Sequence, residues 1–552
     1  MSASITMEAE PVQNTSSPPY WAAAAADQGV DTSVVNTDYE APMYPLQRAP
    51  TSMSVYSDIS GRAEDAIPST NTVSGDFMFP SLPVESPPDT WDPFGGISAS
   101  LQDMPPLTAN VDVWPAQVNE ETLLPWIDVY FKRLHPTVPV LNRTNMYREM
   151  LMRKHHIDTQ YGAMLLGLCA FAMTQPVQIH ERANTPSRSA QAQMLMQECV
   201  KMRVVADFGE DPTIEMVLTS FFLFACLFGN NRHRAARLRL REAVDLAYSM
   251  GLHLPLSYEG LEPEAREQYL RTYLVLSVTE RAYALQQRLS IDFRGRPGIA
   301  ARFMQSFGPS DATNYITTLL YQDPSDAVGM IGLMYLMETF DAIDENVINC
   351  WNGNCRFSDG ACEMFDRRRA LQMFRAQHKA REACLSGSIS FAPSASPVPL
   401  AQLAASQIAD ISVTQFWLLN RLWNLCLSHG LLREESEYSE LRYEFACQIG
   451  RVLLHTCNEL SLEALETHGI GIVEKIYDVT IGVTTAVSSS TLLMLDSTVS
   501  GDTDLPAPVN GIEPAATVAE ILQGLRILIQ TLRGGDHQYT LLVESAINGV
   551  LS

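Results

Sequence analysis

Residues 212–254 read PTIEMVLTSFFLFACLFGNNRHRAARLRLREAVDLAYSMGLHL, and this stretch decides the fold class of the chain. Its first half, 213–228, is apolar on nearly every face, which predicts a helix buried at the centre of a large helical bundle. Its second half, 234–250, is amphipathic, and Gly251 is placed to end that helix. The apolar stripe consists of Ala236, Leu240, Ala243, Val244 and Ala247. We therefore predict an all-α fold around this pair of helices.

Further helical patterns extend in both directions from the pair. Ile127, Tyr130, Phe131 and Leu134 recur at helical spacing before Pro136, which stops the run. More helices are predicted at 270–287, 411–428, 439–458 and 517–533. The last helix has an apolar stripe for which core packing is the usual role, with a docking surface as the alternative. That stripe consists of Val518, Ile521, Leu522, Leu525, Ile529 and Leu532.

The N-terminal region differs sharply in composition from the rest of the chain. Residues 1–120 contain 16 acidic side chains and two basic ones, and they are rich in Pro, Ser, Thr and Ala. Such a segment cannot bury enough apolar surface to offset the entropy lost on ordering. We predict a disordered acidic tail at 1–115 and a helical domain at 116–552, with loops near 386–400 and 497–510.

Aromatic residues in this tail lie beside acidic ones. Alternation of acidic and hydrophobic residues is typical of disordered activation segments, in which charge keeps the aromatic side chains solvated until a partner groove binds them. The alternative interpretation is a solvated tail with incidental aromatic residues. The residues concerned are Phe77, Phe79, Trp91, Phe94 and Trp114.

Four ordered blocks between Asn119 and Arg302 resemble the middle homology region of fungal zinc-cluster transcription factors. They are Leu123–Asn142, with its YF…HP..P turn, Pro212–Phe228, Asn231–Leu254, which ends in GLHL, and Arg271–Ile291. The fourth block is similar to one in which the family carries a Glu-Arg pair, here Glu280 and Arg281. Because apolar residues cover most faces of helix 270–287, we expect at least one of these two charges to lie inside the fold.

The six-cysteine motif that normally precedes this region is not found in the 552 residues. A binuclear zinc cluster needs two Cys-x-x-Cys pairs and two further cysteines, whereas this sequence has ten cysteines and no Cys-x-x-Cys. We therefore assign no residue of this chain to a DNA-binding zinc cluster. Cys350, Cys355 and Cys362 form one group, with His378 and Cys384 downstream, and buried structural thiols are favoured there over a metal site. Lys154-His155-His156 is interpreted as a solvated helix end.

Charge and motifs limit the remaining functions. A net charge of −25 opposes direct nucleic-acid binding, and no apolar run approaches the roughly 20 residues that cross a bilayer. The basic stretch from Arg232 to Arg241 is expected to form surface ion pairs, such as Arg239 with Glu242 and Arg241 with Asp245. No phosphate loop, Gly-x-Ser-x-Gly or His-Glu-x-x-His motif occurs. We therefore assign no catalytic, cofactor-binding or metal-binding residues, and we expect no cofactor. The residues that would bind DNA stay undefined.

The resemblance implies a fungal regulator of transcription in the nucleus that controls a metabolic pathway or a secondary-metabolite gene cluster. Its expected partners are the transcription machinery or a co-activator, bound through the tail, and a DNA-binding partner or a second copy of the chain. Two alternatives stay open. One is a truncated zinc-cluster factor whose cysteines are encoded by an upstream exon, and the other is a helical interaction or scaffold protein outside transcription. An all-helical enzyme is a more distant alternative.

Overall fold

The computed structural model describes residues 113–175, 185–203, 209–298, 324–355, 357–358, 361–388, 398–489 and 517–551. The predicted all-α class is confirmed within these ranges, where β structure is confined to a hairpin of two-residue strands, β1 (Phe357–Ser358) and β2 (Ala361–Cys362). The predicted tail lies outside the described residues except for 113–115. The predicted loop at 497–510 lies wholly outside them, and of the loop at 386–400 only the ends are described.

The N-terminal half of the described chain contains the helices α2 (Leu124–Val129), α3 (Arg143–Leu151), α4 (Lys154–Ile157), α5 (Thr159–Thr174), α6 (Thr185–Met202), α7 (Ile214–Gly229), α8 (His233–Ser249) and α9 (Pro263–Gln287). The C-terminal half contains α12 (Pro324–Phe340), α13 (Glu345–Trp351), α14 (Arg367–Ser386), α15 (Ala405–Ser428), α16 (Phe445–Glu459), α17 (Leu462–Glu466), α18 (Ile470–Ser489), α19 (Val518–Thr531) and α20 (Tyr539–Leu551). Short 3-10 turns lie at Glu120–Thr122, Pro255–Tyr258, Leu400–Gln402, Ser439–Leu441 and Leu532–Gly535.

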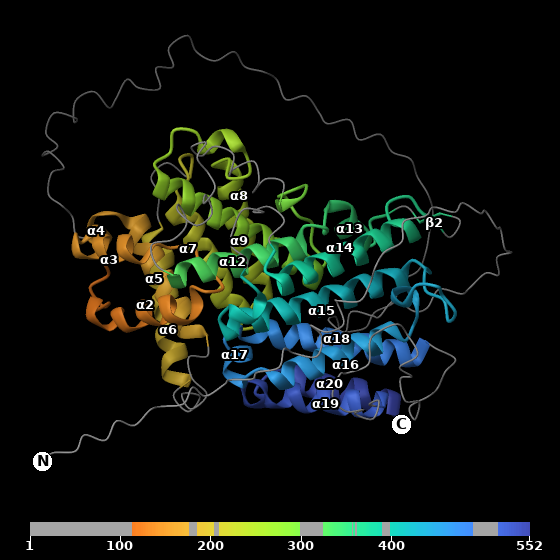
Figure 1. Ribbon diagram of the computed structural model, residues 1–552. Coiled ribbons are helices and arrows are strands. Elements are labelled where there is room, and N and C mark those ends of the chain that lie inside the picture. Colours follow the sequence, from red (N-terminus) through yellow and green to blue (C-terminus); the bar gives the residue numbers. More distant parts are fainter. Residues whose placement is uncertain are drawn as a thin grey trace, which may run out of the picture. The chain divides into compact units, whose positions relative to one another are not determined.

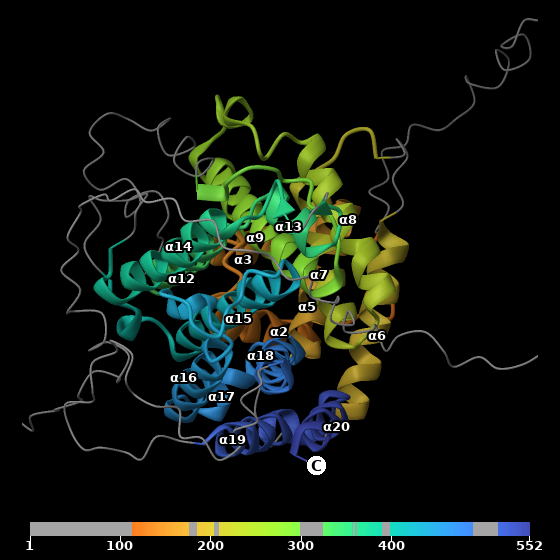
Figure 2. The same cartoon turned by 90° about the vertical axis from the view of Figure 1, so that its right-hand side faces the viewer.

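The predicted central pair is α7 and α8, and both predictions are confirmed. Almost every residue of α7 is buried, and the helix packs against α5 on one side and α8 on another (Figures 1 and 2). Phe222 of α7 stacks on Phe171 of α5 with ring centroids 5.9 Å apart. The Thr213 side chain accepts a hydrogen bond from the Met216 amide and so caps α7. The predicted stripe of α8 is buried, and Gly251 follows the helix with a φ of +72°.

Two hydrophobic cores meet along α9. Tyr273 to Leu276 of α9 belong to a core made mainly by α2 to α8, whereas Ala284 and Leu285 belong to a core made mainly by α13 to α20. In the second core, α15 contacts α14, α16 and α18, and α18 contacts α19 and α20 (Figure 1). The apolar stripe predicted for 517–533 is buried in this core, which confirms the core-packing interpretation of α19.

Half-buried charges join α15 to α18. Asp478 of α18 accepts hydrogen bonds from Arg421 and from Trp417 Nε1, the latter at 2.8 Å. One turn away, Lys475 Nζ lies 3.2 Å from Asp410 Oδ1. A buried charge is tolerated when it is paired and hydrogen-bonded, so these contacts fix how α15 and α18 face each other. None of the described helices is long and apolar enough to span a membrane.

The predicted helix start at 411 is wrong by six residues, because α15 begins at Ala405. The usual sequence signal for a helix start is a Ser, Thr, Asp or Asn cap, and Ala404 is none of these. Instead, the Gln407 side chain accepts a hydrogen bond from the Ala404 amide.

Candidate functional site

Glu280 and Arg281 both lie inside the fold, with 4% and 1% of their surface exposed, which confirms the predicted burial. Glu280 accepts a hydrogen bond from the Asp292 amide at Oε1 (2.7 Å) and from the Phe293 amide at Oε2 (3.2 Å). The carboxylate of α9 therefore holds the main chain of the loop that follows this helix.

Arg281 holds the same loop from the other side. Its Nη2 donates to the carbonyls of Phe293 (2.8 Å) and Gly295 (2.7 Å), and its Nε donates to the carbonyl of Ile343 (2.9 Å). Ile343 lies in the connection between α12 and α13. The two side chains thus clamp residues 292–295 and tie them to the C-terminal half of the chain. We call this arrangement the Glu280–Arg281 clamp.

Burial shapes the protonation of the clamp. Removal from water raises the pKa of Glu280 to about 7, although the two backbone amides and the Arg281 charge favour the ionised form. Burial also lowers the pKa of Arg281. The hydrogen-bond partners of both groups are main-chain amides and carbonyls, so the pair is stabilised by the loop it holds.

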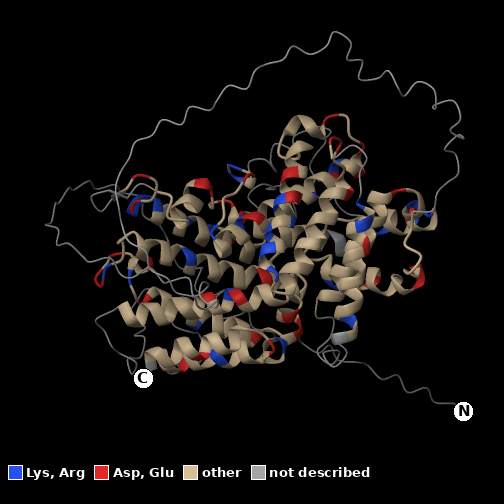
Figure 3. Ribbon diagram, turned by 180° about the vertical axis from the view of Figure 1, so that it is seen from behind, with Lys and Arg blue, Asp and Glu red and all other residues tan. Residues whose placement is uncertain are grey.

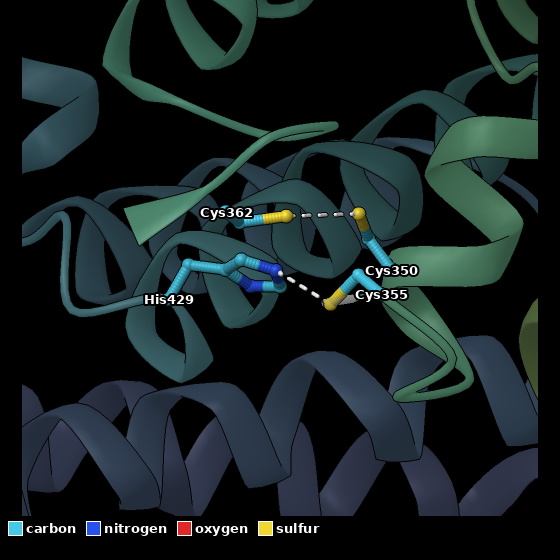
Figure 4. Close-up of side chains that lie close together, drawn as sticks. All are labelled: Cys350, Cys355, Cys362 and His429. Carbon is cyan, nitrogen blue, oxygen red and sulfur yellow. Dashed lines mark hydrogen bonds between the residues drawn. The ribbon is translucent and has the colours of Figure 1, made fainter. Parts of the chain in front are cut away.

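A second cluster combines three cysteines with one histidine. Cys350 lies in the last turn of α13, Cys355 five residues further on, Cys362 on β2, and His429 at the C-cap of α15 (Figure 4). The Sγ atoms of Cys350 and Cys362 are 3.7 Å apart, and Cys355 Sγ lies 3.5 Å from His429 Nε2. The four ligand atoms all lie within 4.8 Å of one another.

The cluster is closed off from solvent. Cys350, Cys362 and His429 are buried and Cys355 is half-buried. The ring of Phe365 packs edge-on against His429, with centroids 5.3 Å apart. Burial raises the pKa of the Cys350 and Cys355 thiols, so in the absence of a cation both are held in the neutral form.

Comparison with known proteins identifies the N-terminal half of the described chain. Residues 127–290 match the family model of the fungal specific transcription factor domain. This segment therefore resembles a fungal specific transcription factor domain. It begins within α2 and ends just before the loop held by the Glu280–Arg281 clamp.

A relative of this chain is known from yeast. Over 282 residues the chain is 22% identical to the "Probable sucrose utilization protein SUC1" of Candida albicans. The match covers 51% of this chain and 48% of the relative, so the chain spans about half the length of the curated relative it matches. No solved structure matches the chain.

The structure brings together only part of the cysteine group considered in the sequence. Cys350, Cys355 and Cys362 converge, whereas His378 lies 3.2 Å from Glu440 and Cys384 contacts Gln415. The histidine that completes the cluster, His429, was missed by sequence reasoning. It lies 67 residues after Cys362 at the end of a different helix, so no spacing rule connects it to the cysteines. Of the four cysteines for which buried structural thiols were predicted, Cys350, Cys362 and Cys384 are buried and Cys355 is half-buried.

The interpretation of Lys154-His155-His156 as a solvated helix end is wrong for both histidines, which are buried. His156 Nε2 lies 2.6 Å from Glu120 Oε1, His155 Nε2 lies 3.2 Å from Glu120 Oε2, and Trp114 packs edge-on against His155. Burial lowers the pKa of His155. Residues 113–120 fold back onto α4 through contacts that no local pattern indicates, so the apolar cover over these rings could not be predicted.

The basic face of α8 forms the surface ion pairs that were predicted. Arg239 Nη1 lies 2.8 Å from Glu242, and Arg241 Nη2 lies 3.9 Å from Asp245. Arg241 also pairs with Asp292, in the loop held by the Glu280–Arg281 clamp. Arg239 and Arg241 are therefore paired with acidic side chains of the same helix and of the loop that follows α9.

Proposed function

We propose that this chain regulates transcription in the nucleus and acts through a DNA-binding partner. The observation that carries the proposal is the fungal specific transcription factor domain at residues 127–290. This family is not an enzyme family, and we assign no catalytic role to the chain. The relative in Candida albicans is described as a sucrose utilization protein, which favours control of genes for a metabolic pathway.

Different parts of the chain take different roles in this proposal. Residues 116–552 form the regulatory domain, which docks on a DNA-binding partner or on a second copy of the chain. Residues 1–115 contact the transcription machinery or a co-activator through aromatic residues set among acids. The clamp of Glu280 and Arg281 stabilises the regulatory domain by joining its two halves.

Charge supports a partner-mediated mechanism. Nucleic-acid affinity comes largely from cationic side chains that displace counterions from phosphates, and this chain has a net charge of −25. On the described helices, basic and acidic residues are interspersed (Figure 3). In the most basic helix segment, on α8, two of the four arginines, Arg239 and Arg241, form ion pairs with Glu242, Asp245 and Asp292.

A tethered reporter assay tests the proposal. Residues 1–552, 1–115 and 116–552 are each fused to an unrelated DNA-binding domain upstream of a reporter gene. We expect activation by the full chain and by 1–115, with loss of activation when Phe77, Phe79, Trp91 and Phe94 become Ala. Trp114 is left unchanged because it packs on His155 in the folded domain. A matched variant changes Tyr20, Trp21 and Tyr44, which have no acidic residue within three positions, and should keep most of the activity. A silent full-length fusion would instead favour a scaffold protein outside transcription.

A further inference from the structure

The cluster of Cys350, Cys355, Cys362 and His429 has the donor set of a structural zinc site. Three thiols and one imidazole are among the ligand combinations that hold Zn(II) in closed tetrahedral sites. Soft sulfur donors combined with imidazole select zinc over magnesium or calcium, which prefer oxygen ligands. The chemistry of the donors therefore points to one class of cation.

Two of the six donor–donor distances match the edges of a zinc tetrahedron, and all six are at most 4.8 Å. With Zn–S bonds of about 2.3 Å and Zn–N bonds of about 2.0 Å, two sulfurs stand about 3.8 Å apart and a sulfur and a nitrogen about 3.5 Å apart. The Cys350–Cys362 separation of 3.7 Å and the Cys355–His429 separation of 3.5 Å agree with these two edges. In Figure 4 the three sulfurs and the imidazole point toward a common centre.

The histidine is already oriented as a zinc ligand. Its Nδ1 lies 2.9 Å from the carbonyl oxygen of Leu425, which fixes the N–H on Nδ1 and directs the lone pair of Nε2 toward Cys355. A metal-bound histidine typically donates its second ring N–H to a backbone carbonyl or a carboxylate in this way. The C-terminal turn of α15 therefore supplies the outer support that such a site needs.

We propose that Cys350, Cys355, Cys362 and His429 bind one Zn(II) ion in a closed structural site. The three thiols lose their protons to solvent on binding, and with the neutral imidazole they leave the site with one net negative charge. All four positions are filled by protein, so the ion has no place for a substrate or a reactive water. This site is independent of the six-cysteine cluster that binds DNA in zinc-cluster factors.

The site explains how a very small hairpin keeps its place in the fold. β1 and β2 have two residues each, too few to be stable as an isolated hairpin. The cation joins β2 to the end of α13 and the end of α15, and so anchors Cys355 and Cys362 on the second hydrophobic core. Its loss is expected to loosen this segment first.

Metal content of the full chain tests the site. The tag-free 552-residue protein is purified without chelator and passed through a desalting column. Its zinc content is then measured by elemental mass spectrometry. We expect one zinc per chain, reduced to near zero in Cys355→Ser and His429→Ala. Cys457→Ser, a buried cysteine outside the cluster, is the matched control and should keep the zinc. Zinc retained in the cluster variants, or well under one equivalent in the wild-type protein, overturns the proposal.

Cobalt substitution gives a readout that does not depend on how the variants fold. Replacing zinc by Co(II) in the wild-type chain should produce the visible absorption of tetrahedral cobalt and a near-ultraviolet thiolate-to-cobalt charge-transfer band. The visible band should shift in His429→Cys, which keeps four ligands. An octahedral cobalt spectrum without a charge-transfer band contradicts the site. The site is also contradicted if the mass of the untreated intact protein is two hydrogens below that of the fully reduced chain and its peptides contain a Cys350–Cys362 disulfide.

Discussion

At the scale of single residues, Arg281 shows how a buried charge finds its hydrogen-bond acceptors in the main chain. Its guanidinium donates to carbonyls of Phe293, Gly295 and Ile343, which lie in two connections outside α9. These acceptors belong to the backbone and therefore leave no signature in the sequence. The sequence predicts that the charge is buried, because the surrounding helix is apolar. It does not predict which groups accept hydrogen bonds from Arg281.

Removing this side chain should destabilise the domain strongly. Arg281→Ala leaves several buried carbonyls without donors, and we expect a loss of about 3–5 kcal/mol in the free energy of unfolding, measured by thermal or urea melts. The stability of Arg281→Lys should lie between those of the wild type and Arg281→Ala, because an ammonium cannot reach all of these acceptors. Exposed Arg234→Ala is the control, with an expected change within about 0.5 kcal/mol. An unchanged melt for Arg281→Ala would show that the clamp is dispensable for folding.

A second residue gives a prediction with a defined pH dependence. Glu474 of α18 is buried near Asp478, and burial together with that charge raises its pKa from 4.5 to about 8. A carboxyl whose pKa is raised on folding costs stability once the pH exceeds its unfolded value, and this cost grows until the folded pKa is reached. Glu474→Gln removes the charge. The stability of the variant relative to wild type should therefore increase from pH 5 to pH 8.

The check is a series of urea melts of both proteins over that pH range. Glu435→Gln, an exposed substitution, should give a difference that does not change with pH. A constant difference for Glu474→Gln would mean that the carboxyl titrates normally in the folded chain.

At the scale of helices, the apolar face of α19 belongs to the core. Leu525 is fully buried on that face, whereas Ile527 on the opposite face is half exposed. We expect Leu525→Ala to cost about 2–5 kcal/mol in the free energy of unfolding, because it leaves a cavity. Ile527→Ala should cost much less. A docking surface would give the reverse pattern, with little loss of stability and weaker partner binding for Leu525→Ala.

The parts of the fold that could be predicted are those determined by neighbouring residues in the sequence. The helices α7, α8 and α19 were predicted from apolar periodicity, because spacing of 3.6 residues is written into contiguous sequence. The cluster of Cys350, Cys355, Cys362 and His429 could not be predicted, since three separate elements bring it together. For the same reason the burial of His155 and His156 was missed. Long-range packing, not composition, decides these sites.

At the scale of the whole molecule, charge and architecture favour a regulator that reaches DNA through another protein. The chain has a net charge of −25, and the segment that matches the transcription factor domain is joined through α9 to a second helical core. A strongly anionic surface repels the phosphate backbone, and specific affinity also depends in large part on cationic contacts. We therefore expect the chain to occupy promoters in the cell while having little intrinsic affinity for DNA, two properties that usually occur together.

The most direct test of the account compares these two properties on the same promoters. The epitope-tagged chain is mapped by chromatin immunoprecipitation in its organism of origin, and the purified 552-residue chain is then titrated on the recovered promoter fragments at physiological salt. The account predicts clear promoter occupancy in the cell and only weak, non-selective binding by the purified chain. Tight, sequence-selective binding by the purified chain, or absence of the chain from promoters, would contradict it.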